Sequence, residues 1–138
     1  MAYFDNAATT YPKPEDVYSF MNEFYRQCGG NAGRGDYGIA KSAGALVADT
    51  RARLQELFHC PAKQVIFTPT ATIALNIILQ GLCEMGVKNF YISPFEHNAV
   101  TRTLHHFEDL GRIKVHQLSV TSELKYDLEK IRYQFDDC

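Results

Sequence analysis

Residues 68–72, TPTAT, place three threonine hydroxyls and the small side chain of Ala71 between a short apolar run and an apolar helical pattern. The first N–H groups of a helix have no partner inside the helix, and the helix dipole favours negative charge at that end. Ala71 lets an anion approach the backbone, and Thr70 and Thr72 can donate hydroxyl hydrogen bonds, so the stretch is typical of a phosphate-binding loop. Caps are common, so the residues alone favour the simpler alternative, an N-cap by Thr70 or Thr72, and leave the phosphate interpretation open.

A second polar stretch, SPFEHNAVTRTL at residues 93–104, has the same position between an apolar run and a helical pattern. It places His97 at or near a helix N-terminus, where an imidazole could stack on an aromatic cofactor or move protons. Spacing alone favours the simpler alternative, a first-turn histidine that faces solvent beside Glu96. No pair among the histidines of the sequence has metal-ligand spacing, so we predict no metal site.

Helices and strands must bring the two loops together, and the hydrophobic pattern of the sequence predicts where these elements lie. Apolar residues recur at helical spacing in residues 15–28 and 40–58, and the glycine-rich residues 29–38 separate these helices. Strands are then expected at residues 65–68, 89–93 and 114–120, and helices at residues 72–83, 97–110 and 128–135. This alternation predicts an α/β fold with a mostly parallel sheet. Because ligands bind beyond the carboxyl ends of parallel strands, both loops lie where a site is expected.

The composition limits the possible functions. The chain has 138 residues, of which 46% are hydrophobic and 22% charged, as in a globular domain. A net charge of −2 leaves no basic stripe for nucleic acid. The first residues lack an export signal, no stretch has the length of a membrane helix, and the four cysteines form no CxxC pair. We therefore expect a cytoplasmic protein with no nucleic-acid or membrane partner.

Four segments carry a resemblance to a known family: YFDNAATTYPKPE, GGNAGRGDYG, FTPTATIALN and SPFEHNAV. In this order and at these intervals they resemble the N-terminal part of class V aminotransferases, fold-type I pyridoxal-phosphate enzymes, nearest to the cysteine desulfurases. The resemblance implies a three-layer fold, with helices on both faces of a mostly parallel sheet. Residues 1–138 would be an incomplete large domain: an extended arm at 1–14, two helices with a glycine-rich loop at 15–58, and βαβαβα units at 59–138.

The resemblance also implies roles for residues of the two loops. Ala71 and Thr72 align with the pair that holds the phosphate of pyridoxal 5'-phosphate through a backbone N–H and a hydroxyl. Thr70 takes the place of the usual glycine just before them. Ile73 stands where the family often has glutamate, a departure that does not touch the phosphate. His97 aligns with the histidine that stacks on the pyridine ring and assists proton transfer.

Further roles follow from the same resemblance. A substrate entrance would be lined by Asn6, Ala7, Asn31 and Arg34. The implied reaction converts L-cysteine to L-alanine and passes persulfide sulfur to an acceptor protein, in a homodimer.

The family's Schiff-base lysine, the aspartate at the pyridine nitrogen and the catalytic cysteine all align beyond Cys138. No lysine of the chain has the family's serine/histidine/lysine context, so we expect a truncated chain that is inactive alone. Two alternatives stay open: another class V aminotransferase or lyase activity, and a non-catalytic fragment that binds a phosphate-bearing ligand. An unrelated nucleotide-binding domain is disfavoured, because the sequence has no G-x-G-x-x-G or G-x-x-x-x-G-K-[ST] motif.

Overall fold

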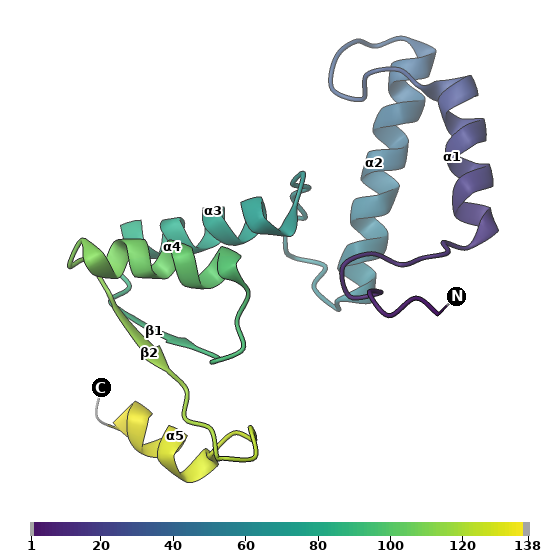
Figure 1. The fold of residues 1–138 in the computed structure, drawn as a ribbon. Helices are drawn as coiled ribbons and strands as arrows, with labels where there is room; N and C mark the ends of the chain where they lie inside the picture. Colours follow the sequence, from purple (N-terminus) through teal and green to yellow (C-terminus); the bar gives the residue numbers. More distant parts are fainter. Residues whose placement is uncertain (1, 137–138) are drawn as a thin grey trace. The chain divides into compact units, whose positions relative to one another are not determined.

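A computed structural model describes residues 2–136 and divides the chain into two compact units, with the boundary between Ile66 and Phe67. The first unit contains α1 (Glu15–Cys28) and α2 (Gly38–Leu57). The second contains, in chain order, α3 (Ala71–Glu84), β1 (Asn89–Ile92), α4 (Asn98–Asp109), β2 (Lys114–Gln117) and α5 (Leu128–Asp136) (Figure 1). Each predicted helix is confirmed to within two residues at either end.

The first unit is a pair of helices that follows a segment without helix or strand at residues 2–14. Glu15 and Asp16 occupy the first turn of α1, where carboxylates complement the helix dipole. Gly29 follows the last residue of α1, and a side chain there would be too close to the helix, because a Cβ would lie 2.7 Å from the carbonyl oxygen of Tyr25. Helix α2 packs against α1 and buries the small side chains of Ala40 and Ala43.

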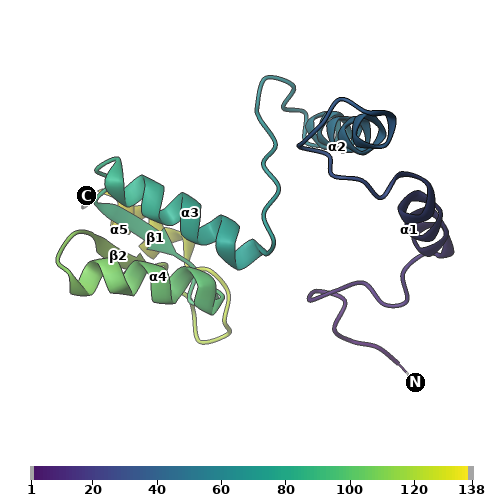
Figure 2. The same cartoon turned by 90° about the horizontal axis from the view of Figure 1, so that it is seen from above.

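The second unit has a parallel pair of strands with helices on both faces. Phe90 of β1 lies opposite Val115 of β2 in the register of the pair. Phe90 and Ile92 point into the core below α3 and α4, which lie side by side in Figure 2. Because alternate strand residues face opposite sides, Tyr91 points to α5 instead. Its ring centroid lies 4.4 Å from that of Phe135.

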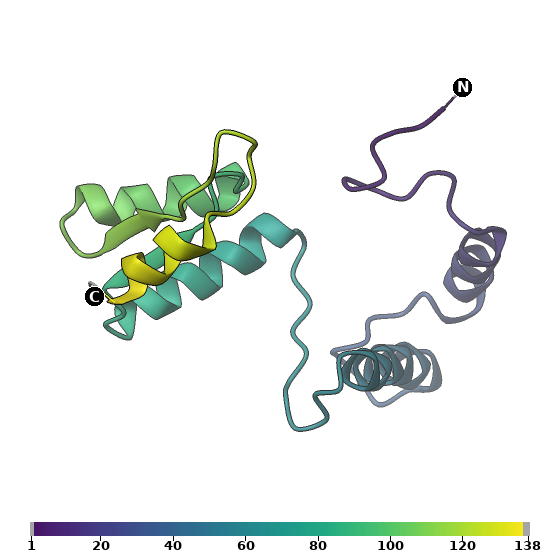
Figure 3. The ribbon, with the colours of Figure 1, turned by 90° about the horizontal axis from the view of Figure 1, so that it is seen from below.

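Helix α5 covers the second face of the sheet and lies in front of the strands in Figure 3. It begins after Asp127, whose Oδ1 accepts a hydrogen bond from the Lys130 N–H at 3.1 Å. The Tyr91 hydroxyl donates to the carbonyl oxygen of Gln134, and the Gln134 amide donates to the carbonyl oxygen of Gln117. These bonds tie α5 to both strands of the sheet.

The predicted strand at residues 65–68 is wrong, and the sheet of the described residues has two strands rather than three. A strand is defined by a ladder of hydrogen bonds to a neighbouring strand, and this segment is not part of such a ladder in the described residues. Instead, the Val65 carbonyl oxygen accepts a hydrogen bond from Arg51 Nε at 3.1 Å, and Ile66 is 77% exposed. Strand β2 ends at Gln117 rather than at residue 120. The parallel arrangement is confirmed for β1 and β2, whereas the full three-layer transferase fold remains a prediction.

Glu108 connects the end of α4 to the start of β2. Its Oε1 accepts a hydrogen bond from the Val115 N–H at 2.7 Å, and its Oε2 lies 3.0 Å from His105 Nδ1. The hydrogen bond from Val115, followed by the one from His105, holds the pKa of the Glu108 carboxyl below its ordinary value. The ionised carboxylate therefore stabilises the folded state more than the protonated acid does.

This shift predicts a pH-dependent stability. A carboxyl whose pKa is depressed in the folded state contributes stability above its ordinary pKa of 4.5, and the contribution disappears as the pH falls through the lower, folded pKa. Glu108→Gln keeps an acceptor for Val115 but cannot ionise. We expect it to be less stable than the wild type at neutral pH and equally stable at strongly acidic pH, as measured by urea unfolding. Glu96→Gln, at an exposed carboxylate with no hydrogen bond to a described residue, is the control.

Candidate functional site

The start of α3 presents backbone donors that have no acceptor among residues 2–136, together with threonine hydroxyls. Thr70 is the N-cap, since its Oγ1 accepts a hydrogen bond from the Ile73 N–H at 3.2 Å. The first intrahelical bond runs from the Ala74 N–H to the Thr70 carbonyl oxygen, so the N–H groups of Ala71 and Thr72 precede any helical acceptor. The N-cap interpretation is thus confirmed for Thr70. Its hydroxyl oxygen accepts in the cap while its own proton stays free to be donated to a ligand.

The start of α4 is capped by His97. The Nδ1 atom of this ring accepts a hydrogen bond from the Ala99 N–H at 3.1 Å. A backbone N–H is always the donor, so Nδ1 carries the lone pair, and the neutral ring carries its proton on Nε2. The exposed ring therefore offers a flat face and an Nε2–H donor.

The structure brings the two predicted loops together. Thr72 and His97 line one cavity of about 270 Å³, together with Asn98, Ala99 and three residues from the facing sides of α3 and α4: Asn76, Arg102 and Thr103. Thr70 and Ala71 precede Thr72 directly but are not part of the lining. The lining includes one basic residue, Arg102, and, among the described residues, no carboxylate. Its charge favours an anionic ligand.

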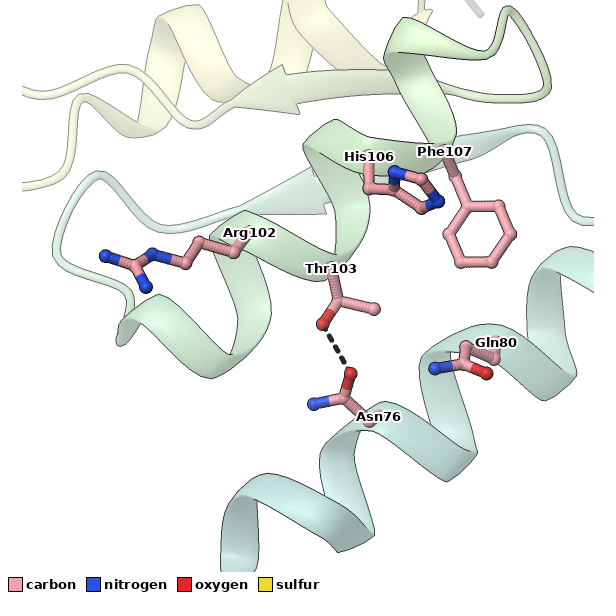
Figure 4. Close-up of a pocket in the computed structure, with 6 residues that line it drawn as sticks. All are labelled: Asn76, Gln80, Arg102, Thr103, His106 and Phe107. Carbon is pink, nitrogen blue, oxygen red and sulfur yellow. Dashed lines mark hydrogen bonds between the residues drawn. The ribbon is translucent and has the colours of Figure 1, made fainter.

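A second cavity, of about 350 Å³, continues along the groove between α3 and α4 (Figure 4). It shares Asn76, Arg102 and Thr103 with the first cavity, and Gln80, His106 and Phe107 complete the lining. Figure 4 shows Thr103 of α4 pointing at Asn76 of α3, and the Thr103 hydroxyl donates to Asn76 Oδ1 at 2.8 Å. None of these residues was predicted from the sequence to belong to a site. One signal was present, because Asn76 and Gln80 follow Thr72 at intervals of four residues in a largely apolar helix.

The predicted substrate-entrance residues all belong to the first unit. Asn6 Oδ1 accepts a hydrogen bond from the Tyr11 N–H, and Asn31 Oδ1 accepts one from the Gly33 N–H at 2.7 Å. These two side chains thus stabilise their own turns. Ala7 and Arg34 are exposed. A role in substrate entry remains a prediction for all four residues.

Other reactive side chains are placed as surface or core residues. The lysines are all exposed: Lys13, Lys41, Lys63, Lys88, Lys114, Lys125 and Lys130. Cys83 is buried in the core, and Cys138 lies outside the described residues. Within residues 2–136, no group of three His, Cys, Asp or Glu side chains is arranged to hold a metal ion. No helix in the same part of the chain is long and apolar enough to cross a membrane.

Comparison with known proteins gives consistent matches. A family model described as aminotransferase class-V matches residues 2–138. A Plasmodium berghei protein that carries the name of a cysteine desulfurase, PbSufS, is 35% identical over 102 residues, which cover 70% of this chain and 19% of that protein. The cysteine desulfurase IscS of Rickettsia felis is 28% identical over 138 residues, which cover 98% of this chain and 33% of that protein. The chain thus spans a third or less of the length of these relatives.

Proposed function

The chain belongs to the aminotransferase class-V family, and from this premise we propose that it supplies the phosphate-binding and ring-stacking residues of a pyridoxal-phosphate-dependent cysteine desulfurase. The observation that carries the proposal is the shared cavity of Thr72 and His97, which come from two loops of the sequence. The names of the relatives support desulfuration within the family.

The residues at this cavity fit a phosphate ester. The N–H groups of Ala71 and Thr72 lack helical acceptors, and the hydroxyls of Thr70 and Thr72 can donate beside them. Arg102 adds a positive charge to the lining. In the proposed site, Thr70, Ala71 and Thr72 bind the phosphate at the positive end of the α3 dipole.

His97 acts at the other end of the cofactor in this proposal. Its ring face stacks on the pyridine ring, and Nε2 holds a proton that can be donated to a substrate atom. The Ala99 N–H fixes the ring orientation through Nδ1. Pyridoxal phosphate, when bound, supplies an aromatic ring that takes up negative charge from the substrate carbon. The groups that react covalently with cofactor and substrate lie outside residues 1–138 in this proposal.

The proposed reaction converts L-cysteine to L-alanine and passes sulfur to an acceptor protein, in a cytoplasmic homodimer. The test is to purify the full-length protein with pyridoxal phosphate, supply L-cysteine, and measure alanine and sulfide. Release of both supports the proposal. Failure to bind the cofactor would overturn it, and a product other than alanine would assign a different class V reaction. After treatment with an equimolar amount of pyridoxal phosphate and borohydride, residues 1–138 alone should show no single lysine that is modified in preference to the other exposed lysines.

The phosphate role predicts the effect of Thr72→Ala in the full-length protein. Loss of one charge-assisted hydrogen bond should weaken pyridoxal phosphate binding by ~1.5–3 kcal/mol. This corresponds to a roughly 10- to 100-fold higher dissociation constant, measured by equilibrium dialysis. Thr72→Ser keeps the hydroxyl and is the matched control. Equal losses in both variants would show that the hydroxyl does not bind the phosphate.

A further inference from the structure

A series of hydrogen bonds connects the two loops through Asn76 and Thr103. Asn76 Nδ2 donates to the Thr72 carbonyl oxygen at 2.8 Å, and Asn76 Oδ1 accepts from the Thr103 hydroxyl at 2.8 Å. Thr103 Oγ1 also lies 3.0 Å from the Ala99 carbonyl oxygen. The Ala99 N–H in turn donates to His97 Nδ1 at 3.1 Å. The series thus begins at the proposed phosphate loop and ends at the ring of His97.

Each partner in this series has a defined orientation. The Thr72 carbonyl oxygen requires a donor, so the amide nitrogen of Asn76 must face it and the amide oxygen must face Thr103. The Thr103 hydroxyl has a single proton for two acceptors, and its bond to the Ala99 carbonyl one turn earlier restricts the rotamer. Thr103 and Asn76 are half-buried, where an unpaired polar group is costly.

The rest of the contact between α3 and α4 is largely apolar. Leu79 and Leu82 of α3 and Val100 of α4 pack against the buried cluster that includes Leu104. Apolar packing is non-directional and fixes the axial offset of two helices less sharply than a hydrogen bond does. In the described part of the chain, the bond from Thr103 to Asn76 is the direct side-chain hydrogen bond between the two helices.

We propose that Asn76 and Thr103 are positioning residues, which fix the offset between the N-termini of α3 and α4. They thereby set the distance from the phosphate-binding groups of Thr72 to the ring of His97. The importance of that distance for turnover rests on the proposed function. A misplacement of about 1 Å at a reacting group can lower a rate by about 100-fold. A hydrogen bond that fixes the offset of the two helices therefore has a large effect on turnover.

Thr103→Val tests the proposal, because valine keeps the shape of threonine and removes the hydroxyl. In the full-length holoenzyme we expect kcat to fall by about tenfold or more, with less than about a threefold change in KM, since the binding groups themselves are intact. The visible circular dichroism of the cofactor should change as well. Thr103→Ser should restore both. Thr101→Val is the control on the same helix, since the Thr101 hydroxyl bonds no described residue.

A second measurement does not depend on the cofactor. In the apoprotein, the Ala99 amide proton should exchange with solvent at least about tenfold faster in Thr103→Val and Asn76→Ala than in the wild type, Thr103→Ser or Thr101→Val. Unchanged Ala99 exchange in Thr103→Val would overturn the proposed role of Thr103 in holding the start of α4, whether or not the protein binds pyridoxal phosphate. Faster exchange with unchanged kcat and cofactor dichroism would overturn its positioning role. Failure of the wild type to bind the cofactor would overturn the proposed function, and with it the proposed effect of Asn76 and Thr103 on turnover.

Discussion

Replacing Leu104 by alanine is expected to lower the free energy of unfolding of the second unit by about 2–5 kcal/mol. Leu104 is 0% exposed and is the largest fully buried side chain among the described residues. It lies on α4 and packs in the cluster that includes Phe90, Ile92 and Phe107. Truncation removes three carbons from the core and leaves a cavity that the strands and helices can fill only in part. Few other single changes should affect this unit as strongly.

Hydrogen exchange under increasing urea measures this loss within the second unit, because exchange at β1 and β2 amides reports opening of the core locally. Leu110→Ala is the matched control, since Leu110 follows the same helix and is 58% exposed. We expect the control to change the stability by less than about 0.5 kcal/mol. Comparable losses in the two variants would contradict the placement of Leu104 at the centre of the core.

Replacing His97 by alanine is expected to slow turnover of the full-length enzyme by about 100-fold or more, the usual contribution of a group that transfers protons. Binding of pyridoxal phosphate should weaken by less than about tenfold, because the proposed phosphate-binding residues belong to the other loop. The variant also loses the cap of α4, which costs about 1 kcal/mol of stability. The rate, the cofactor dissociation constant and the unfolding midpoint therefore need to be measured on the same preparation.

His97→Asn separates the loss of the imidazole from the loss of the α4 cap. Asparagine is a strong N-cap residue, so this variant should regain most of the stability that His97→Ala loses. It has no imidazole, so turnover should stay low. Recovery of turnover in His97→Asn would show that the cap is the function of His97. If His97→Ala strongly weakens cofactor binding but keeps its turnover when the cofactor is supplied in excess, the proposed roles of His97 and Thr72 are exchanged.

The helices could be predicted from the sequence because their signals are local. Glu15 and Asp16 at the start of α1 and the apolar spacing that follows lie within one segment, as do Thr70 and the apolar run of α3. Strand formation depends on a distant partner, which is why the apolar residues 65–68 were predicted as a strand that the structure does not form.

In the candidate site, too, the residues of local motifs could be predicted, whereas contacts between residues far apart in the sequence could not. Thr72 and His97 stand in recognisable loops and line a common cavity, although only the loop of His97 follows a strand of the described sheet, β1. Asn76 and Thr103 are separated by 27 residues, so no local pattern indicates their hydrogen bond. The orientation of the His97 ring depends on the backbone geometry of Ala99, and the sequence does not reveal it.

The burial of Cys83 in the core gives the second unit its own folding reporter. This thiol is 5% exposed and packs in the cluster around Leu104, whereas Cys28 and Cys60 of the first unit are half-buried. An alkylating reagent can reach Cys83 only in molecules whose core has opened. The alkylation rate at this cysteine, read by peptide mass, therefore measures core opening under native conditions. Variants that loosen α3 or α4 can be ranked in this way without any denaturant.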